Sequence, residues 1–289
     1  MEKSSVHLRF TGLTVNFSPL QGCHLPHRCR SETIMECYYR PDLWDFAFSD
    51  ETDFEADFIQ QMASRWLNTN RPAVLEIGCG GGRQTVNLAM RGLPVTAFDL
   101  NPTCVRETQR RLKRRRLAAN VFSADMLDFQ TSETFDLAHC LVNTFRHLTD
   151  ERSARCHLQA VARALRPGGL YLLGFHLLPP DAAEEDCERW TLRRGKKSVT
   201  VTVRVLQFCR RTRLETVRFS LKATLPSGVI RLRSDHQLRI YRADQFRSLL
   251  RAVPEFELLS VHDFCYDADN PLPLDDQLGD AVFVLRRRG

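Results

Sequence analysis

The sequence predicts an α/β fold, in which a seven-stranded, mostly parallel sheet has helices on both faces and carries an inserted antiparallel β-meander. Two observations support this. Between residues 73 and 177, short apolar runs alternate with helix-like segments, and strands connected in that way pair in parallel. Between residues 198 and 241, three runs rich in β-branched residues are joined by links too short for a crossover, so they must pair antiparallel.

The composition is that of an ordinary globular protein. Hydrophobic residues make up 43% of the 289-residue chain and charged residues 26%, which excludes extensive disorder. A chain of this length can bury a substantial core. We expect one α/β domain over residues 37–289, preceded by a poorly ordered extension over residues 1–36.

The N-terminal extension shows no sustained periodicity. It holds cysteines and histidines whose spacing matches no standard paired zinc finger, so we expect no metal site there. With Cys37 just beyond it, this group is Cys23, His24, His27, Cys29 and Cys37. The first twenty residues have no apolar signal core, and no stretch is long enough to span a membrane. Ten scattered cysteines then favour reduced thiols in a cytoplasmic protein.

The first helix is expected to begin near Asp50. Thr52 and Glu55 have the spacing of a capping box. Aromatic and Met side chains then recur every four residues and are expected to pack in the core. These are Phe54, Phe58, Met62 and Trp66.

Five strands should follow in the parallel part of the sheet. They are Ala73–Ile77, Pro94–Phe98, Val121–Ser123, Phe135–Leu141 and Leu170–Leu177. Helices are expected at Gln84–Met90, from Pro102 onward and at Glu151–Leu165, since proline suits a first helical position. The proline and glycines of residues 166–169 predict a turn before the fifth strand.

The meander is expected to lie within an insertion over residues 180–241. Its strands are Ser198–Phe208, Arg213–Leu225 and Val229–Tyr241. Val199, Val201 and Val203 share one apolar face, which either the core or a second subunit of a homodimer must cover. The insertion is therefore a lid or an oligomer contact. A helix and two strands then return the chain to the main sheet, at Ala243–Val253, Glu255–Phe264 and Ala281–Leu285.

The most informative segment is the glycine loop after the first strand. Its pattern is E-x-G-x-G-x-G, formed by Glu76, Gly78, Gly80 and Gly82. A dinucleotide fingerprint requires glycine where Arg83 stands, and an acid before the loop would repel a pyrophosphate. The loop therefore suits a ligand with a cationic group better than a nicotinamide cofactor.

Two more strand ends carry matching residues. The second strand ends in Phe98-Asp99-Leu100-Asn101, and the third leads into residues 122–126, Phe-Ser-Ala-Asp-Met. With the glycine loop, these segments make residues 37–289 resemble the class I S-adenosylmethionine-dependent methyltransferases, which have a Rossmann-like sheet. The resemblance implies S-adenosyl-L-methionine as cofactor, with Asp99 accepting the ribose hydroxyls, Asp125 the adenine amine and Met126 beside the ring. The implied cofactor-binding residues are Glu76, Gly78, Gly80, Gly82, Asp99, Leu100, Asp125, Met126 and Leu141.

The fourth strand leads into the segment that lies beside the methyl group in this family. Here it lacks the N/D-P-P-Y/F signature of nucleic-acid methyltransferases, because Thr-Phe follows Asn143. By the resemblance, Asn143 would orient the acceptor and Arg146 would pair with an acidic group. His147 would act as a base or simply pack locally. Upstream, Tyr39 and Trp44 lie in a segment resembling a lid, where they either cover the site or pack.

The leading hypothesis is a methyltransferase that modifies N or O of a soluble small molecule, without a metal or a membrane. The chain carries a formal charge of +6, and residues 103–119 alone hold seven basic side chains against Glu107. An alternative is therefore an RNA or DNA methyltransferase that uses the basic helix 106–116. A catalytically silent cofactor-binding module is the third hypothesis.

Overall fold

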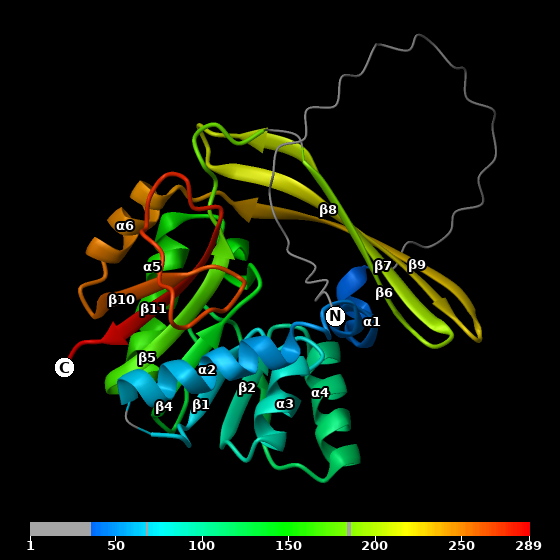
Figure 1. Cartoon of the computed structure of the whole chain (residues 1–289), viewed down its shortest axis with the longest axis horizontal. Helices are drawn as coiled ribbons and strands as arrows, with labels where there is room; N and C mark the ends of the chain where they lie inside the picture. The colour runs from blue at the N-terminus through cyan, green and yellow to red at the C-terminus, as the bar shows by residue number, and fades with distance from the viewer. Residues whose placement is uncertain (1–35, 68, 184–185) are drawn as a thin grey trace.

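The computed structural model describes residues 36–67, 69–183 and 186–289. Seven strands form the main sheet in the order β10-β11-β5-β4-β1-β2-β3 (Figure 1). β1 to β5 pair in parallel, and β11 runs antiparallel between β5 and β10. This confirms the predicted mostly parallel α/β sheet. The strands are β1 (Val74–Ile77), β2 (Val95–Asp99), β3 (Asn120–Ser123), β4 (Phe135–Cys140), β5 (Leu165–His176), β10 (Phe256–His262) and β11 (Asp280–Arg287).

Helices cover both faces of this sheet. The buried side chains of α5 (Glu151–Ala164) and α6 (Ala243–Arg251) share one core cluster with Leu75 of β1. Val74, the residue directly before Leu75, belongs instead to the cluster that contains the buried side chains of α2. Successive strand residues point to opposite faces, so β1 separates the two layers. The second layer comprises α2 (Thr52–Leu67), α3 (Arg83–Met90) and α4 (Pro102–Arg115).

The meander is a separate sheet of four antiparallel strands, one more than predicted. The strands are β6 (Cys187–Arg194), β7 (Lys197–Cys209), β8 (Leu214–Leu225) and β9 (Gly228–Arg239). β6 was missed because its charged residues hide an alternating pattern in which Glu188, Trp190 and Leu192 share the less exposed face.

The N-terminal helices of the same chain cover the apolar face of the meander. Val199 and Val201 of β7 are fully buried, in one cluster with Leu43 and Phe48. Leu43 lies in α1 (Pro41–Ala47) and Phe48 directly follows it. With η1 (Cys37–Tyr39), this segment lies beneath the β6–β7 end of the sheet (Figure 1). This face therefore does not require a second subunit.

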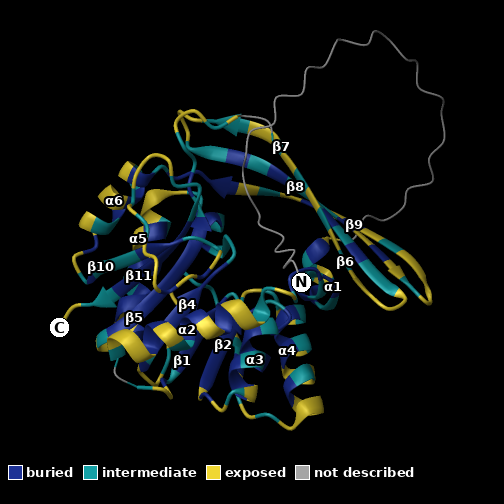
Figure 2. Ribbon diagram, viewed as in Figure 1, coloured by how far each residue is buried: buried dark blue, intermediate teal, exposed yellow. Residues whose placement is uncertain are grey.

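The prediction that four regularly spaced side chains of α2 pack in the core was wrong for the first and the last of them. Phe58 and Met62 are fully buried, but Phe54 is 64% exposed and Trp66 37% exposed. The physical reason is the helical repeat of 3.6 residues, which rotates a row of every fourth residue gradually around the helix. The buried face instead includes Ile59 and Ala63. Figure 2 shows that α2 has both buried and exposed sides.

The turn predicted at residues 166–169 is a bulge inside β5. β5 already begins at Leu165, and its register with β4 jumps from Phe135–Leu165 to Leu137–Leu170. Residues 166–169 of β5 therefore lie opposite the single residue Asp136 of β4, and β5 continues beyond them.

The arginines of α4 mostly face solvent, as Figure 2 shows for the outer side of that helix. Arg111 is an exception, because it forms an ion pair with Asp45 of α1 and donates to the carbonyl of Gly81 at 2.7 Å. None of the helices in the described ranges is long and apolar enough to cross a membrane.

The N-terminal cysteines and histidines fall on both sides of the boundary at residue 36. Residues 23–29 lie outside the described residues, as does almost all of the predicted extension. Cys37 is fully buried, and its thiol donates to the carbonyl of Phe219 in β8 at 3.6 Å. Cys37 therefore helps to join η1 to the meander.

Candidate active site

A cleft of about 2010 Å³ lies between the carboxyl ends of the parallel strands and the inner face of the meander. Sites for a single small ligand usually span about 300–1,000 Å³. The cleft therefore has room for two ligands side by side. In an open α/β sheet this edge, where β1 lies between β4 and β2, is the usual ligand position.

The glycine loop forms the floor of one half of the cleft. Gly78 and Gly80 line it, and the backbone N–H of Gly80 donates to Asp99 Oδ2 at 2.8 Å. A Cβ on Gly78 would lie 2.6 Å from the Thr144 side chain, so this position holds the loop against the segment after β4. Gly82 does not line the cleft. A Cβ at this position would lie 2.5 Å from the Thr108 side chain of α4, so Gly82 allows the loop to pack closely against that helix.

Asp99 is held at the end of β2. Its Oδ1 accepts the backbone N–H of Asn101 at 2.8 Å while Oδ2 accepts that of Gly80. Burial raises the pKa of the Asp99 carboxyl above its ordinary value. The next residue, Leu100, lies at the rim of the cleft and is 70% exposed. Asp99 thus faces the cleft from a fixed position.

The remaining residues predicted to bind the cofactor lie close by. Asp125 Oδ1 accepts the N–H of Leu127 at 2.9 Å, and the carbonyl of Met126 lies 2.9 Å from His157 Nδ1. Both residues line the cleft, as does the buried Leu141. The structure therefore brings together every predicted cofactor residue except Gly82.

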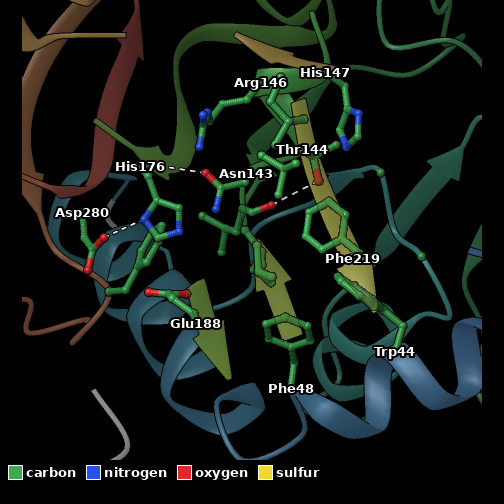
Figure 3. A pocket seen from close by; sticks show the side chains of 18 of the residues that line it. Trp44, Phe48, Asn143, Thr144, Arg146, His147, His176, Glu188, Phe219 and Asp280 are labelled. Carbon is green, nitrogen blue, oxygen red and sulfur yellow. Dashed lines mark hydrogen bonds and ion pairs between the residues drawn. The ribbon is translucent and has the colours of Figure 1, made fainter. Parts of the chain in front are cut away.

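The other half of the cleft is bordered by the turn after β4. Val142 and Asn143 both adopt positive φ, at 57° and 66°, and lead into the short helix η2 (Thr144–His147). Asn143 Oδ1 accepts the backbone N–H of His176 at 2.8 Å (Figure 3). This bond fixes the Asn143 amide at the border between the two halves of the cleft.

His147 is held by an aromatic cluster at the end of η2. Its Nε2 lies 3.3 Å from the hydroxyl of Tyr38, and its ring centroid lies 5.4 Å from that of His236. Burial, with His236 and Arg146 nearby, lowers the pKa of His147 to about 4. The imidazole is therefore neutral at pH 7 and only a weak proton acceptor.

Tyr39 does not occupy the position expected of it. It is 52% exposed and lies outside the cleft, whereas its neighbour Tyr38 lines the cleft. Trp44 of α1 also lines it. The N-terminal segment therefore borders the site as expected, but adjacent residues point in different directions, and the sequence pattern assigned the wrong tyrosine.

Arg146 is not free to bind an acceptor. Its guanidinium forms a buried ion pair with Glu215 of β8, and its Nε donates to the carbonyl of Arg239 at 2.8 Å. The prediction that Arg146 pairs with an acidic group was right about the charge but wrong about the partner, which belongs to the meander. This contact attaches the meander to the turn after β4.

The comparisons agree with this geometry. Residues 74–169 match the family described as a methyltransferase domain. The cypemycin N-terminal methyltransferase from Streptomyces is 32% identical over 137 residues, which make up 43% of this chain and 54% of that protein. The chain spans about half the length of the curated relatives it matches.

Solved structures extend the likeness to nearly the whole chain. The sugar N-methyltransferase KedS8 from Streptoalloteichus has a TM-score of 0.68 at 19% identity, covering 93% of this chain and 100% of that one. CalS10, an amino pentose methyltransferase from Micromonospora echinaspora, has a TM-score of 0.64 at 19% identity, covering 89% and 100%. Residues 74–169 belong to a methyltransferase domain. The fold of the chain is that of the S-adenosylmethionine-dependent methyltransferases.

Unpartnered polar atoms show that the methyltransferase domain can accommodate a polar ligand. His139 Nε2 and Gln84 Oε1 are buried without a hydrogen-bond partner in the described parts of the chain, and both residues line the cleft near Glu76. Burial lowers the pKa of His139 to about 3, so its ring is neutral. Buried polar groups are normally satisfied, so these two atoms mark where a ligand or water would bind.

Glu76 is the buried carboxyl of this region. It accepts a hydrogen bond from the hydroxyl of Thr85, and burial raises its pKa to about 8. In the unfolded chain the carboxyl loses its proton at a much lower pH, so the folded state binds the extra proton between these two values. Stability must therefore fall as the pH rises toward 8.

We expect Glu76→Gln to remove this decrease of stability with pH, because the amide keeps an acceptor oxygen for Thr85 and cannot ionise. Between pH 6 and 8 the unliganded wild type should lose about 1 kcal/mol more stability per pH unit than the variant. Urea unfolding at pH 6, 7 and 8 measures the difference. Equal slopes in the two proteins would show that Glu76 is already ionised when folded.

Sequence reasoning missed Glu188, which lines the cleft from β6. The side chain is half-buried, and burial raises its pKa to about 7, with Asp186 and Asp280 adding to the effect. The alternation of Glu188 with Trp190 could have indicated a strand with an inward carboxylate. Only the fold shows that β6 lines the cleft.

Proposed function

We propose that this protein is a methyltransferase that transfers the methyl group of S-adenosyl-L-methionine to N or O of a soluble small molecule. The observation that carries the proposal is the division of one cleft into two halves. Glycine-loop and strand-end residues line one half, and the meander with the N-terminal helices encloses the other.

The first half suits the cofactor in charge and shape. Asp99 and Asp125 are the two carboxylates placed to accept hydroxyl and amine hydrogens, and each already holds a backbone N–H that fixes its orientation. Glu76, with the unpartnered atoms of Gln84 and His139, would face the amino-acid end. When bound, S-adenosylmethionine supplies a methyl carbon attached to a positively charged sulfur, which keeps the electron pair when the methyl leaves.

The protein's own contribution is alignment and exclusion of water. Asn143 is fixed by His176 at the border of the two halves, and the meander covers the acceptor side with Val203, Val217 and Phe219. A small acceptor fits this arrangement better than a polynucleotide. KedS8 is a sugar N-methyltransferase and CalS10 an amino pentose methyltransferase, which supports an acceptor of that size.

Calorimetry with S-adenosylmethionine tests the cofactor half. We expect Asp99→Ala to weaken binding on the order of tenfold to a hundredfold, since it removes charge-assisted hydrogen bonds and releases Gly80. Glu133→Ala, a change at an exposed loop residue, is the matched control and should bind as the wild type does. Unchanged affinity in Asp99→Ala would overturn the assignment of this residue, and absence of wild-type binding would overturn the proposed function.

A further inference from the structure

A carboxylate in the acceptor half of the cleft has no partner among the residues that the structure describes. Glu188 lies opposite Val203 of β7, on the half-buried face of β6 that also carries Trp190. Across the three described ranges, no N–H group or cation forms a hydrogen bond or ion pair with the Glu188 carboxylate. By contrast, Arg83 and Arg146, the arginines buried along the cleft, are both paired with glutamates.

The surroundings of Glu188 are acidic. Asp280 lies near it on β11 and is bound to His176 Nδ1 at 2.6 Å, and Asp186 lies two residues before it. The ionisable groups that line this half of the cleft come from several elements. Besides Glu188 they include Arg146, His147, His176, Asp181, Asp186, Cys187, Arg189, Arg204, Glu215, Asp263 and Asp280. Arg189 and Arg204 are exposed, whereas Asp186 and Asp280 are half-buried and are the charges that act on Glu188, so the nearest charged groups are acidic.

Aromatic rings form the wall of the cleft across from this carboxylate. The centroid of Trp44 lies 5.3 Å from that of Phe48 and 5.4 Å from that of Phe219. In Figure 3 these three rings lie on one side of the cavity, with Glu188 and Asn143 on the other. Aromatic faces attract cations, and a carboxylate across the cavity can accept charge-assisted hydrogen bonds from an ammonium group bound between them.

We propose that the acceptor is an amine, bound as its ammonium ion between Glu188 and the rings of Trp44, Phe48 and Phe219, and that Glu188 receives the proton that must leave before methylation. This inference rests on the proposed function, because it names the acceptor of that same site. An N–H bond breaks, the proton passes to a Glu188 oxygen, and the electron pair stays on nitrogen. That pair forms the new N–C bond, the positive charge moves from sulfur to nitrogen, and Glu188 releases its proton to solvent.

Glu188 suits this step better than His147 does. An effective proton acceptor has a pKa near the working pH. The carboxyl of Glu188 has a pKa of about 7, whereas that of His147 is about 4. His147 is also held against Tyr38, so its Nε2 is occupied within the protein.

A pair of probes of equal shape tests the site without relying on turnover. Binding of isopropylammonium and of isopropanol to the full chain is measured by NMR titration, with and without S-adenosylhomocysteine. We expect the ammonium ion to bind at least tenfold more tightly than the alcohol. Glu188→Gln should reduce this preference at least severalfold, to what the rings alone provide, while leaving alcohol binding unchanged, and Glu133→Gln should leave both unchanged.

The pH dependence gives a second readout. Ammonium binding to the wild type should strengthen from pH 6 to 8 as Glu188 loses its proton, and it should stay flat in Glu188→Gln. Equal affinity of the wild type for the two probes, or a preference as large in Glu188→Gln as in the wild type, would overturn the inference.

Failure of this inference can be told apart from failure of the proposed function. If the cofactor binds and labelled methyl passes only to hydroxyl acceptors, the protein is a methyltransferase but not one for amines. If the cofactor does not bind, the function is wrong, whatever the probes show.

Discussion

Replacing Glu215 by Gln should destabilise the protein by about 3–5 kcal/mol, because it leaves the buried guanidinium of Arg146 without its carboxylate. Both side chains of this pair are less than 10% exposed. A charge that is buried and unpaired costs much more than the pair contributes in net terms. Urea unfolding, monitored by circular dichroism, measures the loss.

An exposed pair on the same sheet provides the matched control. Arg218 and Asp235 join β8 to β9 at 2.6 Å, with a third or more of each side chain exposed. Asp235→Asn should cost less than about 1 kcal/mol, since solvent screens such pairs. The double variant Arg146→Met with Glu215→Leu should recover at least half of the stability lost in Glu215→Gln. A loss in Glu215→Gln as small as that in Asp235→Asn would contradict the buried-pair argument.

The second large effect is expected for Gly82→Ala, at about 3–4 kcal/mol. The residue has a φ of +81°, which costs an L-residue about 1–2 kcal/mol, and the new Cβ would lie 2.5 Å from the fully buried Thr108. The glycine loop and α4 would have to separate. Urea unfolding again measures the loss.

Gly92→Ala separates backbone strain from the steric clash. Gly92 has the same φ of +81°, but a Cβ there would meet nothing within 4 Å. Its substitution should therefore cost only about 1–2 kcal/mol. Adding Thr108→Ser to Gly82→Ala should restore part of the loss, because it removes the methyl group that the new Cβ would strike. If Gly82→Ala and Gly92→Ala lose the same stability, the contact with Thr108 is unimportant.

The cofactor half of the site could be predicted because it is local in sequence. The order strand, glycine loop and helix places Gly78 and Gly80 at a strand end, and parallel pairing brings Asp99 and Asp125 to the same edge. Each step depends on residues close together in the chain. For this reason eight of nine predicted residues line the cleft, and Gly82 differs only because its surroundings include α4.

The acceptor half could not be predicted, because its residues meet only through long-range packing. Arg146 and Glu215 are 69 positions apart, and Tyr38 and His147 are 109 apart. No local pattern says which of two adjacent tyrosines points inward or which carboxylate pairs with an arginine. The direction of each side chain is set by how α1 and the meander pack against each other.

The sequence by itself determined the α/β sheet, the antiparallel meander and the carboxylates at the ends of the first three strands, since hydrophobic period and glycine placement specify these locally. Only the tertiary structure decided that α1 covers the meander, that Arg146 is already paired and that the Glu188 carboxylate lies inside the cleft with no partner among the described residues. The physical reason is that a charge acquires its role from burial and from its neighbours, and both arise only when distant segments come together.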